Sequence, residues 1–491
     1  MKTANVPAIP PFRSEPARRH HTSKFMAFGM AGRIVALAGC SSAPAAQSMP
    51  ETTAAVETSV ATSADRLALG TKATYPGAPT GTLPDAPDGF EPVLVEHVAR
   101  HGSRMLSSKK YDDLIIQLWE LAKADDALTE TGMKLGPVVE EITKAHEKLG
   151  YGSLSGLGER EHQEMAERTY QRMAATFDAA AIEGKEVRVS TSGVDRAIDS
   201  AQNFVVGLEK AKPELAPMIQ EPATDKDLLY FHDTDEAYNG YLEEDETLAQ
   251  TIEKIESDPA IESTANHVLQ RLFTPEFIKV LDSGEIDLVD RGDGDKHLSS
   301  VVDAAMYLYE LYVIAPGMAD EHKIDFSDFV SAEDALVLAR VSEAEDFYEK
   351  GPAFEGSDVT YSMAKVLLQE MLGAVEGVRN GETTQAADFR FAHAEEIIPL
   401  AALMQLPGST KQQSPAALFS YETNEWRGAE VAPMGSNIQW DVHANESQDV
   451  IVRMLYNEKV IPFGFDCSPV EPGSLFYRDT ELKRCLEPVA G

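Results

Sequence analysis

Two histidines, three arginines and one glutamate follow β-rich segments of this sequence, and these residue types can bind and cleave a phosphate ester. The first group, Arg100-His101-Gly102-Ser103-Arg104, directly follows the apolar run 92–99. Guanidinium groups on both sides of an imidazole suit phosphate oxygens, because each guanidinium can donate two parallel hydrogen bonds. Gly102 would let the backbone approach an anion closely. Taken alone, the segment could equally be a solvent-exposed loop.

A second group follows the β-rich run 185–190, where the chain reads Thr191-Ser-Gly-Val-Asp-Arg196. Apolar residues then recur at helical spacing from Ala197 to Leu208, so Arg196 is expected in the first turn of a helix. Arg196 could bind the same phosphate or pair with a nearby carboxylate such as Asp199. Both interpretations stay open for this segment alone.

The third group is His393-Ala394-Glu395, between the run 388–392 and an apolar helical segment. His393 and Glu395 would lie at a helix N-terminus, where the helix dipole favours a bound anion. An ordinary helix cap with a first-turn carboxylate would explain the triplet without catalysis.

Together these residues predict hydrolysis of a phosphomonoester. A histidine nucleophile accounts for His101, and an acid that protonates the leaving alcohol accounts for Glu395. The groups expected to hold the phosphate oxygens are Arg100, Arg104, Arg196 and His393. His97 and His101 have a spacing that places two metal ligands on one face of a helix, but this segment is expected to be a strand and a turn. We therefore expect no metal at these histidines, and the hydrolysis predicted here requires no metal or organic cofactor.

The chain has 491 residues, with 81 acidic against 43 basic side chains and a formal net charge of −38. Such a charge excludes general attraction to nucleic acid or to an anionic membrane, so a bound anion needs a local basic pocket. The expected partner is a small phosphorylated molecule. The oligomeric state stays open.

The N-terminal 40 residues resemble a signal peptide: basic residues precede an apolar run that ends at Leu37-Ala38-Gly39-Cys40. The ending is similar to a bacterial lipobox, which predicts lipid on Cys40 and a surface lipoprotein. A plain cleaved signal and secretion is the alternative. Residues 41–87, rich in small and polar residues, are expected to form a flexible tether. Export also predicts a disulfide between Cys467 and Cys485, because an oxidising compartment favours it.

The segment 100–104 resembles the Arg-His-Gly-x-Arg signature of the histidine phosphatase superfamily. The segment Phe391–Glu396 is similar to the His-Ala-Glu variant of the multiple inositol-polyphosphate phosphatases within its acid-phosphatase and phytase branch. Leu154–Gly158, Ser190–Arg196 and Arg453–Pro462 resemble further segments of the same family.

This resemblance covers about residues 88–491. It implies an α/β fold, with a twisted and mostly parallel sheet flanked by helices. Residues 88–206 and 386–491 would form the catalytic domain, and 207–385 a mostly helical insertion. The implied function is hydrolysis of inositol polyphosphates such as phytate through a phosphohistidine. A broad-specificity acid phosphatase or sugar phosphatase is the alternative enzyme, and a lipoprotein that only binds phosphorylated ligands is the alternative outside enzymes.

Two departures from the family pattern bear on the pocket. The family often has an aromatic residue and then proline after the signature, whereas this chain continues with Met105-Leu106-Ser-Ser-Lys109-Lys110. Lys109 and Lys110 are therefore candidate contacts for the outer phosphates of a substrate, or simply an exposed lysine pair. Glu395 stands where the branch usually has aspartate, which lengthens the reach of the acid.

Overall fold

The computed structural model describes residues 65–77, 83–292 and 294–490. The signal-like segment and Cys40 lie outside these residues. Among the helices of the described residues, none is both long and apolar enough to cross a membrane.

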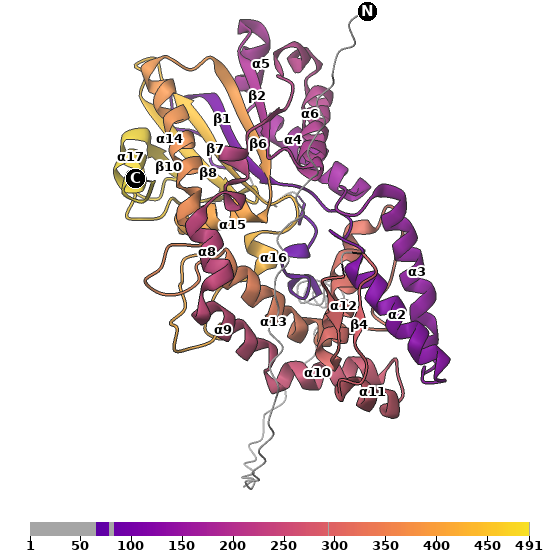
Figure 1. Cartoon of the computed structure of the whole chain (residues 1–491). Helices are drawn as coiled ribbons and strands as arrows, with labels where there is room; N and C mark the ends of the chain where they lie inside the picture. Colours follow the sequence, from indigo (N-terminus) through magenta and orange to yellow (C-terminus); the bar gives the residue numbers. More distant parts are fainter. Residues whose placement is uncertain (1–64, 78–82, 293, 491) are drawn as a thin grey trace, which may run out of the picture. The chain divides into compact units, whose positions relative to one another are not determined.

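The main sheet has the strand order β10-β8-β7-β1-β6-β2-β3, with β9 beside β8 (Figure 1). Its strands are β1 (Glu91–Arg100), β2 (Glu186–Thr191), β3 (Ala223–Thr224), β6 (Gln385–Ala392), β7 (Asn437–Ala444), β8 (Val450–Tyr456), β9 (Lys459–Ile461) and β10 (Phe476–Arg478), while β4 (Leu288–Val289) and β5 (His297–Leu298) form a separate pair. The three strands predicted before the phosphate-binding segments are β1, β2 and β6, and all three are confirmed.

The α/β class is confirmed, but the sheet is mixed rather than mostly parallel. Strands β1, β6, β2 and β3 run parallel, whereas β7, β8, β9 and β10 pair antiparallel. The connection between β7 and β8 is only residues 445–449, too short for the crossover that a parallel pair requires. The C-terminal strands therefore add an antiparallel half to the sheet.

Both faces of β1 are buried, because the strand lies between β6 and β7 with helices on each side. Val95 and Ala99 pack in one core, and Leu94 and Val98 pack in another, as expected for side chains that alternate along a strand. His97 shares the first face with the rings of Phe204, Phe389 and Phe391. It is therefore a core residue.

Helices α4 (Gly156–Arg172), α5 (Ala174–Glu183) and α6 (Asp195–Ala211) cover one face of the sheet, and α14 (Lys365–Asn380) and α17 (Asp479–Ala490) lie on the other (Figure 1). The remaining helices are α2 (Lys110–Ala124), α3 (Gly132–Leu149), α7 (Lys226–Leu229), α8 (Glu236–Glu244), α9 (Glu246–Glu256), α10 (Pro259–Gln270), α11 (Pro275–Asp282), α12 (Val301–Ile314), α13 (Ala332–Glu349), α15 (Ala394–Leu403) and α16 (Gly428–Val431). Short 3-10 helices are η1 (Gly70–Lys72), η2 (Pro213–Met218), η3 (Phe231–Asp233), η4 (Ala315–Met318) and η5 (Ser362–Ala364).

The segment between β2 and β6 is mostly helical, as expected for the insertion. Helix α2, which lies within the range predicted for the catalytic domain, packs against α12 of the insertion. Conversely, α14 lies within the predicted insertion and packs against β1, β7 and β8 of the sheet. The limits at residues 206 and 386 therefore stay predictions.

The tether prediction is wrong for residues 65–77, which pack into the fold. Ala68, Thr71 and Ala73 are buried. The backbone carbonyl of Ala68 accepts a hydrogen bond from the buried hydroxyl of Tyr309 at 3.0 Å. The composition of this segment is poor in large apolar side chains, but its backbone supplies the acceptors that buried donors require.

The predicted disulfide between Cys467 and Cys485 is confirmed. It joins the loop that precedes β10 to helix α17.

Candidate active site

The predicted catalytic residues meet at one edge of the parallel half of the sheet. Strand β1 ends at Arg100, opposite Ala392 of β6, and Thr191 at the end of β2 lies opposite Phe391. Because all three strands run in the same direction, the residues that follow them emerge at the same edge. The imidazole rings of His101 and His393 lie 5.5 Å apart, measured between centroids.

The ring of His101 is held in the orientation and tautomer that a nucleophile needs. Its Nδ1 lies 2.9 Å from the carbonyl oxygen of Gly102, and because a carbonyl can only accept, Nδ1 carries the proton. The lone pair therefore lies on Nε2. Burial, followed by the charges of Arg196 and Arg100, lowers the pKa of His101 well below its ordinary value. His101 is thus neutral at physiological pH.

Three guanidinium groups surround this imidazole. Nη1 of Arg100 donates to the carbonyl oxygens of Thr71 at 2.6 Å and Ala432 at 2.5 Å. These two hydrogen bonds fix the position of the guanidinium group. Nη1 of Arg104 donates to the Met105 carbonyl at 2.7 Å. The buried Nε of Arg196 has no partner among the described residues.

The mutual repulsion of these cations favours a bound anion. Burial, followed by the charges of Arg196 and Arg100, lowers the pKa of Arg104 to about 9. A phosphate placed between the three groups would relieve this repulsion and accept their free N–H donors.

The turn that carries the signature is braced by helix α4. A Cβ atom at Gly102 would lie 2.7 Å from the Gly158 carbonyl oxygen, so only glycine fits there. Glu161 of α4 accepts hydrogen bonds from Ser103 N at 2.7 Å, Ser103 Oγ at 2.8 Å and Tyr75 N at 2.9 Å. The carboxylate therefore ties the segment 65–77 to the catalytic turn.

His393 is positioned by neighbours on two sides. Its Nε2 lies 2.8 Å from the hydroxyl of Ser192, which follows β2. Its backbone N–H donates to Glu396 Oε2 at 2.9 Å, and the other oxygen of Glu396 lies 2.7 Å from Nδ1 of His232. Residue 232 belongs to η3 of the insertion, so this carboxylate joins the insertion to the start of α15.

Glu395, the predicted acid, is paired with a lysine. Nζ of Lys350 donates to Glu395 Oε1 at 3.1 Å and lies 3.0 Å from Oδ1 of Asp346. Burial alone would raise the pKa of Glu395, but the charges of Lys350 and His232 hold this pKa well below its ordinary value. With Lys350 paired to it, the carboxyl group is therefore ionised at physiological pH.

Three site residues carried no motif that sequence reasoning could use: Lys72, His232 and Lys350. Lys72 lies close enough to Arg104, Arg100 and Asp346 to interact with their charges, and burial is the main cause that lowers the pKa of its ammonium group. Each of the three comes from a segment outside the strand ends. Only their tertiary packing brings them to the site.

Lys109 and Lys110, which follow the signature, each form an ion pair with a carboxylate. Lys109 Nζ lies 2.7 Å from Glu147, and Lys110 Nζ lies 2.9 Å from Asp295. A role of Lys109 and Lys110 in binding outer phosphates stays a prediction.

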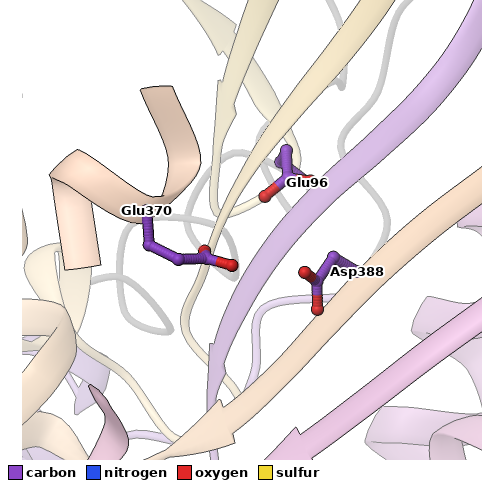
Figure 2. Close-up of side chains that lie close together, drawn as sticks. All are labelled: Glu96, Glu370 and Asp388. Carbon is purple, nitrogen blue, oxygen red and sulfur yellow. The ribbon is translucent and has the colours of Figure 1, made fainter. Parts of the chain in front are cut away.

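A group of three carboxylates lies beside β1, in the region shown in Figure 2. Glu96 of β1, Asp388 of β6 and Glu370 of α14 point toward one another (Figure 2). The guanidinium group of Arg390 lies 2.8 Å from both Glu96 and Asp388 and also contacts Glu370. Arg188 pairs with Asp388 and with Glu370. Arg390 and Arg188 already pair with these oxygens, so the group is a structural ion cluster and a poor metal site.

The histidines and arginines predicted to bind phosphate meet at one edge of an α/β sheet, and comparison with known proteins identifies the family. Residues 94–457 match the family model described as histidine phosphatase superfamily, branch 2. This chain belongs to that family.

Solved structures give more specific similarities. The multiple inositol polyphosphate phosphatase of Bifidobacterium longum, in complex with inositol hexasulfate, is 35% identical with a TM-score of 0.80, over 85% of this chain and 97% of that chain. Its complex with phosphate matches at 34% identity, a TM-score of 0.81 and the same coverage. The phytase from D. castellii shares the fold, with a TM-score of 0.62 at 14% identity, over 87% of this chain and 86% of that chain. A search among curated proteins finds no match.

Proposed function

We propose that this protein is a phosphomonoesterase that hydrolyses inositol polyphosphates, including inositol hexakisphosphate, through a phosphohistidine on His101. The observation that carries the proposal is the neutral His101 ring, with Nε2 available among three guanidinium groups and Glu395 at the adjoining helix start. The similarity to the Bifidobacterium longum phosphatase, crystallised with inositol hexasulfate, supports the substrate class.

In the reaction, Nε2 of His101 attacks phosphorus in line and forms the phosphorus–nitrogen bond while the ester phosphorus–oxygen bond breaks. Arg100, Arg104 and Arg196 hold the non-bridging oxygens, and stabilisation of this kind is usually the largest catalytic contribution. Protonated Glu395 donates its proton to the departing inositol oxygen. In the second step Glu395 accepts a proton from the water that cleaves the phosphohistidine.

A broad-specificity acid phosphatase or sugar phosphatase would use the same catalytic residues. Lys72 and Lys350 favour a polyphosphorylated substrate, because they add cations beside the three arginines that a single phosphate already engages. A protein that binds phosphorylated ligands without turnover would have no need of a neutral imidazole or of a carboxyl group beside it.

The test is to quench the reaction of substrate with labelled phosphate and to locate the label. Acid-labile label on His101 is expected, and His101→Ala should lose both the label and turnover. His322→Ala is the matched control, because this exposed histidine pairs with Glu141 at 2.8 Å. Normal turnover by His101→Ala would refute the mechanism.

We also propose that the protein is exported and held at the cell surface by lipid on Cys40, with secretion as the alternative. The basic, apolar and small-residue order before Cys40 supports export. Mass spectrometry of the mature N-terminus tests this proposal. An unmodified Cys40, or a different first residue, would leave only secretion.

A further inference from the structure

The residue that pairs with Glu395 conflicts with the role of Glu395 as an acid. A general acid must carry a proton when the leaving oxygen departs. However, Lys350 Nζ lies 3.1 Å from Glu395 Oε1, and this pairing keeps the carboxyl group ionised. Lys350 and Glu395 must therefore separate before Glu395 can donate a proton to the leaving oxygen.

The surroundings of Lys350 allow it to move without losing its charge partner. Its side chain extends from the end of α13 and is 15% exposed, and its ammonium group also lies 3.0 Å from Asp346. Asp346 is itself fixed, because Oδ2 accepts a hydrogen bond from Thr71 Oγ1 at 2.7 Å. A flexible four-carbon stem can therefore swing away from Glu395 while Asp346 still compensates the ammonium group.

We propose that Lys350 is a specificity residue that couples recognition of a second phosphate to protonation of Glu395. While the two side chains are paired, Lys350 holds Glu395 as a carboxylate. A substrate phosphate next to the one being cleaved draws the ammonium group of Lys350 onto its own oxygens. Glu395, released beside a new anion, then takes up a proton from solvent and becomes the acid. A substrate with one phosphate leaves the pair intact.

Other charged groups also face Glu395 and influence the pKa of its carboxyl group. His232 of η3, His393 at the start of α15 and Arg100 of β1 all interact with its charge. Arg104 does so from the catalytic turn, and Glu396 from the same helix. These groups stay in place in every variant below, so a change in the pH profile reports Lys350.

This inference rests on the proposed function and is tested with Lys350→Met. The substrates are inositol hexakisphosphate and glycerol 2-phosphate, whose single phosphate also has a poor leaving group. Single-turnover phosphorylation rates are measured across pH, so that hydrolysis of the phosphohistidine does not mask the first step.

Because removal of the ammonium group lets Glu395 hold its proton to higher pH, the alkaline fall in the rate on glycerol 2-phosphate should move up by about one pH unit or more. The KM for inositol hexakisphosphate should rise at least tenfold, with little change in KM for glycerol 2-phosphate.

Two further variants separate this role from a structural one. Lys350→Arg keeps the positive charge and should keep the wild-type pH profile. Lys483→Met is the matched control, because this exposed lysine pairs with Glu376 at 3.2 Å. An unmoved pH profile in Lys350→Met, or an equal rise in KM on both substrates, would overturn the inference. Absence of phosphohistidine in the wild-type protein would instead overturn the proposed function.

Discussion

Replacing Glu161 should damage both the stability and the catalytic turn, and the structure sets the size of the effect. This carboxylate is 7% exposed and accepts three hydrogen bonds, two from Ser103 and one from Tyr75. Hydrogen bonds to a charged group contribute about 1.5–3 kcal/mol each, and a buried donor left without an acceptor carries its full desolvation cost. Glutamine offers only one acceptor oxygen, and its NH2 group would face an N–H donor.

Glu161→Gln should therefore lower the free energy of unfolding by about 2–4 kcal/mol. Because Ser103 lies between His101 and Arg104, the same change should reduce kcat/KM at least tenfold. The loss should be similar on inositol hexakisphosphate and p-nitrophenyl phosphate, since the turn serves phosphate binding whatever the leaving group. Urea unfolding and steady-state kinetics give the two numbers.

Glu164→Gln provides the control on the same helix. Glu164 is 63% exposed and lies 3.8 Å from Arg168, and such surface pairs contribute about 0–1 kcal/mol. This variant should match the wild-type protein in both assays. An unchanged urea midpoint in Glu161→Gln, together with unchanged kcat/KM, would refute the bracing role of α4.

Three further predictions follow from other contacts of the site and the fold. Ser192→Ala removes the hydroxyl beside Nε2 of His393 and should reduce kcat/KM about five- to tenfold, the equivalent of one net hydrogen bond, without changing the urea midpoint by more than about 1 kcal/mol. Cys467→Ser opens the disulfide and should lower the free energy of unfolding by about 3 kcal/mol; a reductant should then weaken the wild-type protein and leave the variant unaffected. Burial raises the pKa of Glu96 to about 8, so between about pH 5 and pH 8 the folded state binds more protons than the unfolded state, whose glutamate pKa is about 4.3. Wild-type stability measured relative to Glu96→Gln should therefore fall as pH rises through this window, and a constant difference would contradict the assignment.

The strand ends could be predicted because each short apolar run is followed directly by side chains that can bind phosphate. Short apolar runs locate β1, β2 and β6, and the polar residues directly after them must meet wherever the strands are parallel and adjacent. This pattern predicts that His101, His393 and the three arginines lie near one another, whereas the roles of Arg196 and His393 stayed open from the pattern alone. The antiparallel half of the sheet was missed because a buried antiparallel strand and a buried parallel strand have the same apolar composition.

Lys350 and His232 could not be predicted, because nothing beside them in the sequence indicates a ligand. Lys350 directly follows helix α13, and His232 lies in a short 3-10 helix of the insertion. Their roles arise when α13 and η3 pack against the start of α15, which depends on contacts far apart in the chain. The ordering of residues 65–77 was missed for a related reason. Amino-acid composition describes only the side chains of a segment. This segment instead contributes a backbone group, the Thr71 carbonyl oxygen, which accepts a hydrogen bond from Arg100.

A net charge of −38 is compatible with the binding of a polyanion, because the nearest charges determine the field at the proposed site. At physiological ionic strength, charges farther apart than about 8 Å are largely screened, so distant surface carboxylates contribute little to the field at His101. The nearest cations are Arg100, Arg104, Arg196, Lys72 and Lys350, and burial strengthens their effect on a bound phosphate. A long polyanion such as nucleic acid would have to approach the acidic surface as well. A compact molecule with several phosphates can contact these cations without covering the acidic surface, which is compatible with the small polyphosphorylated substrate proposed above.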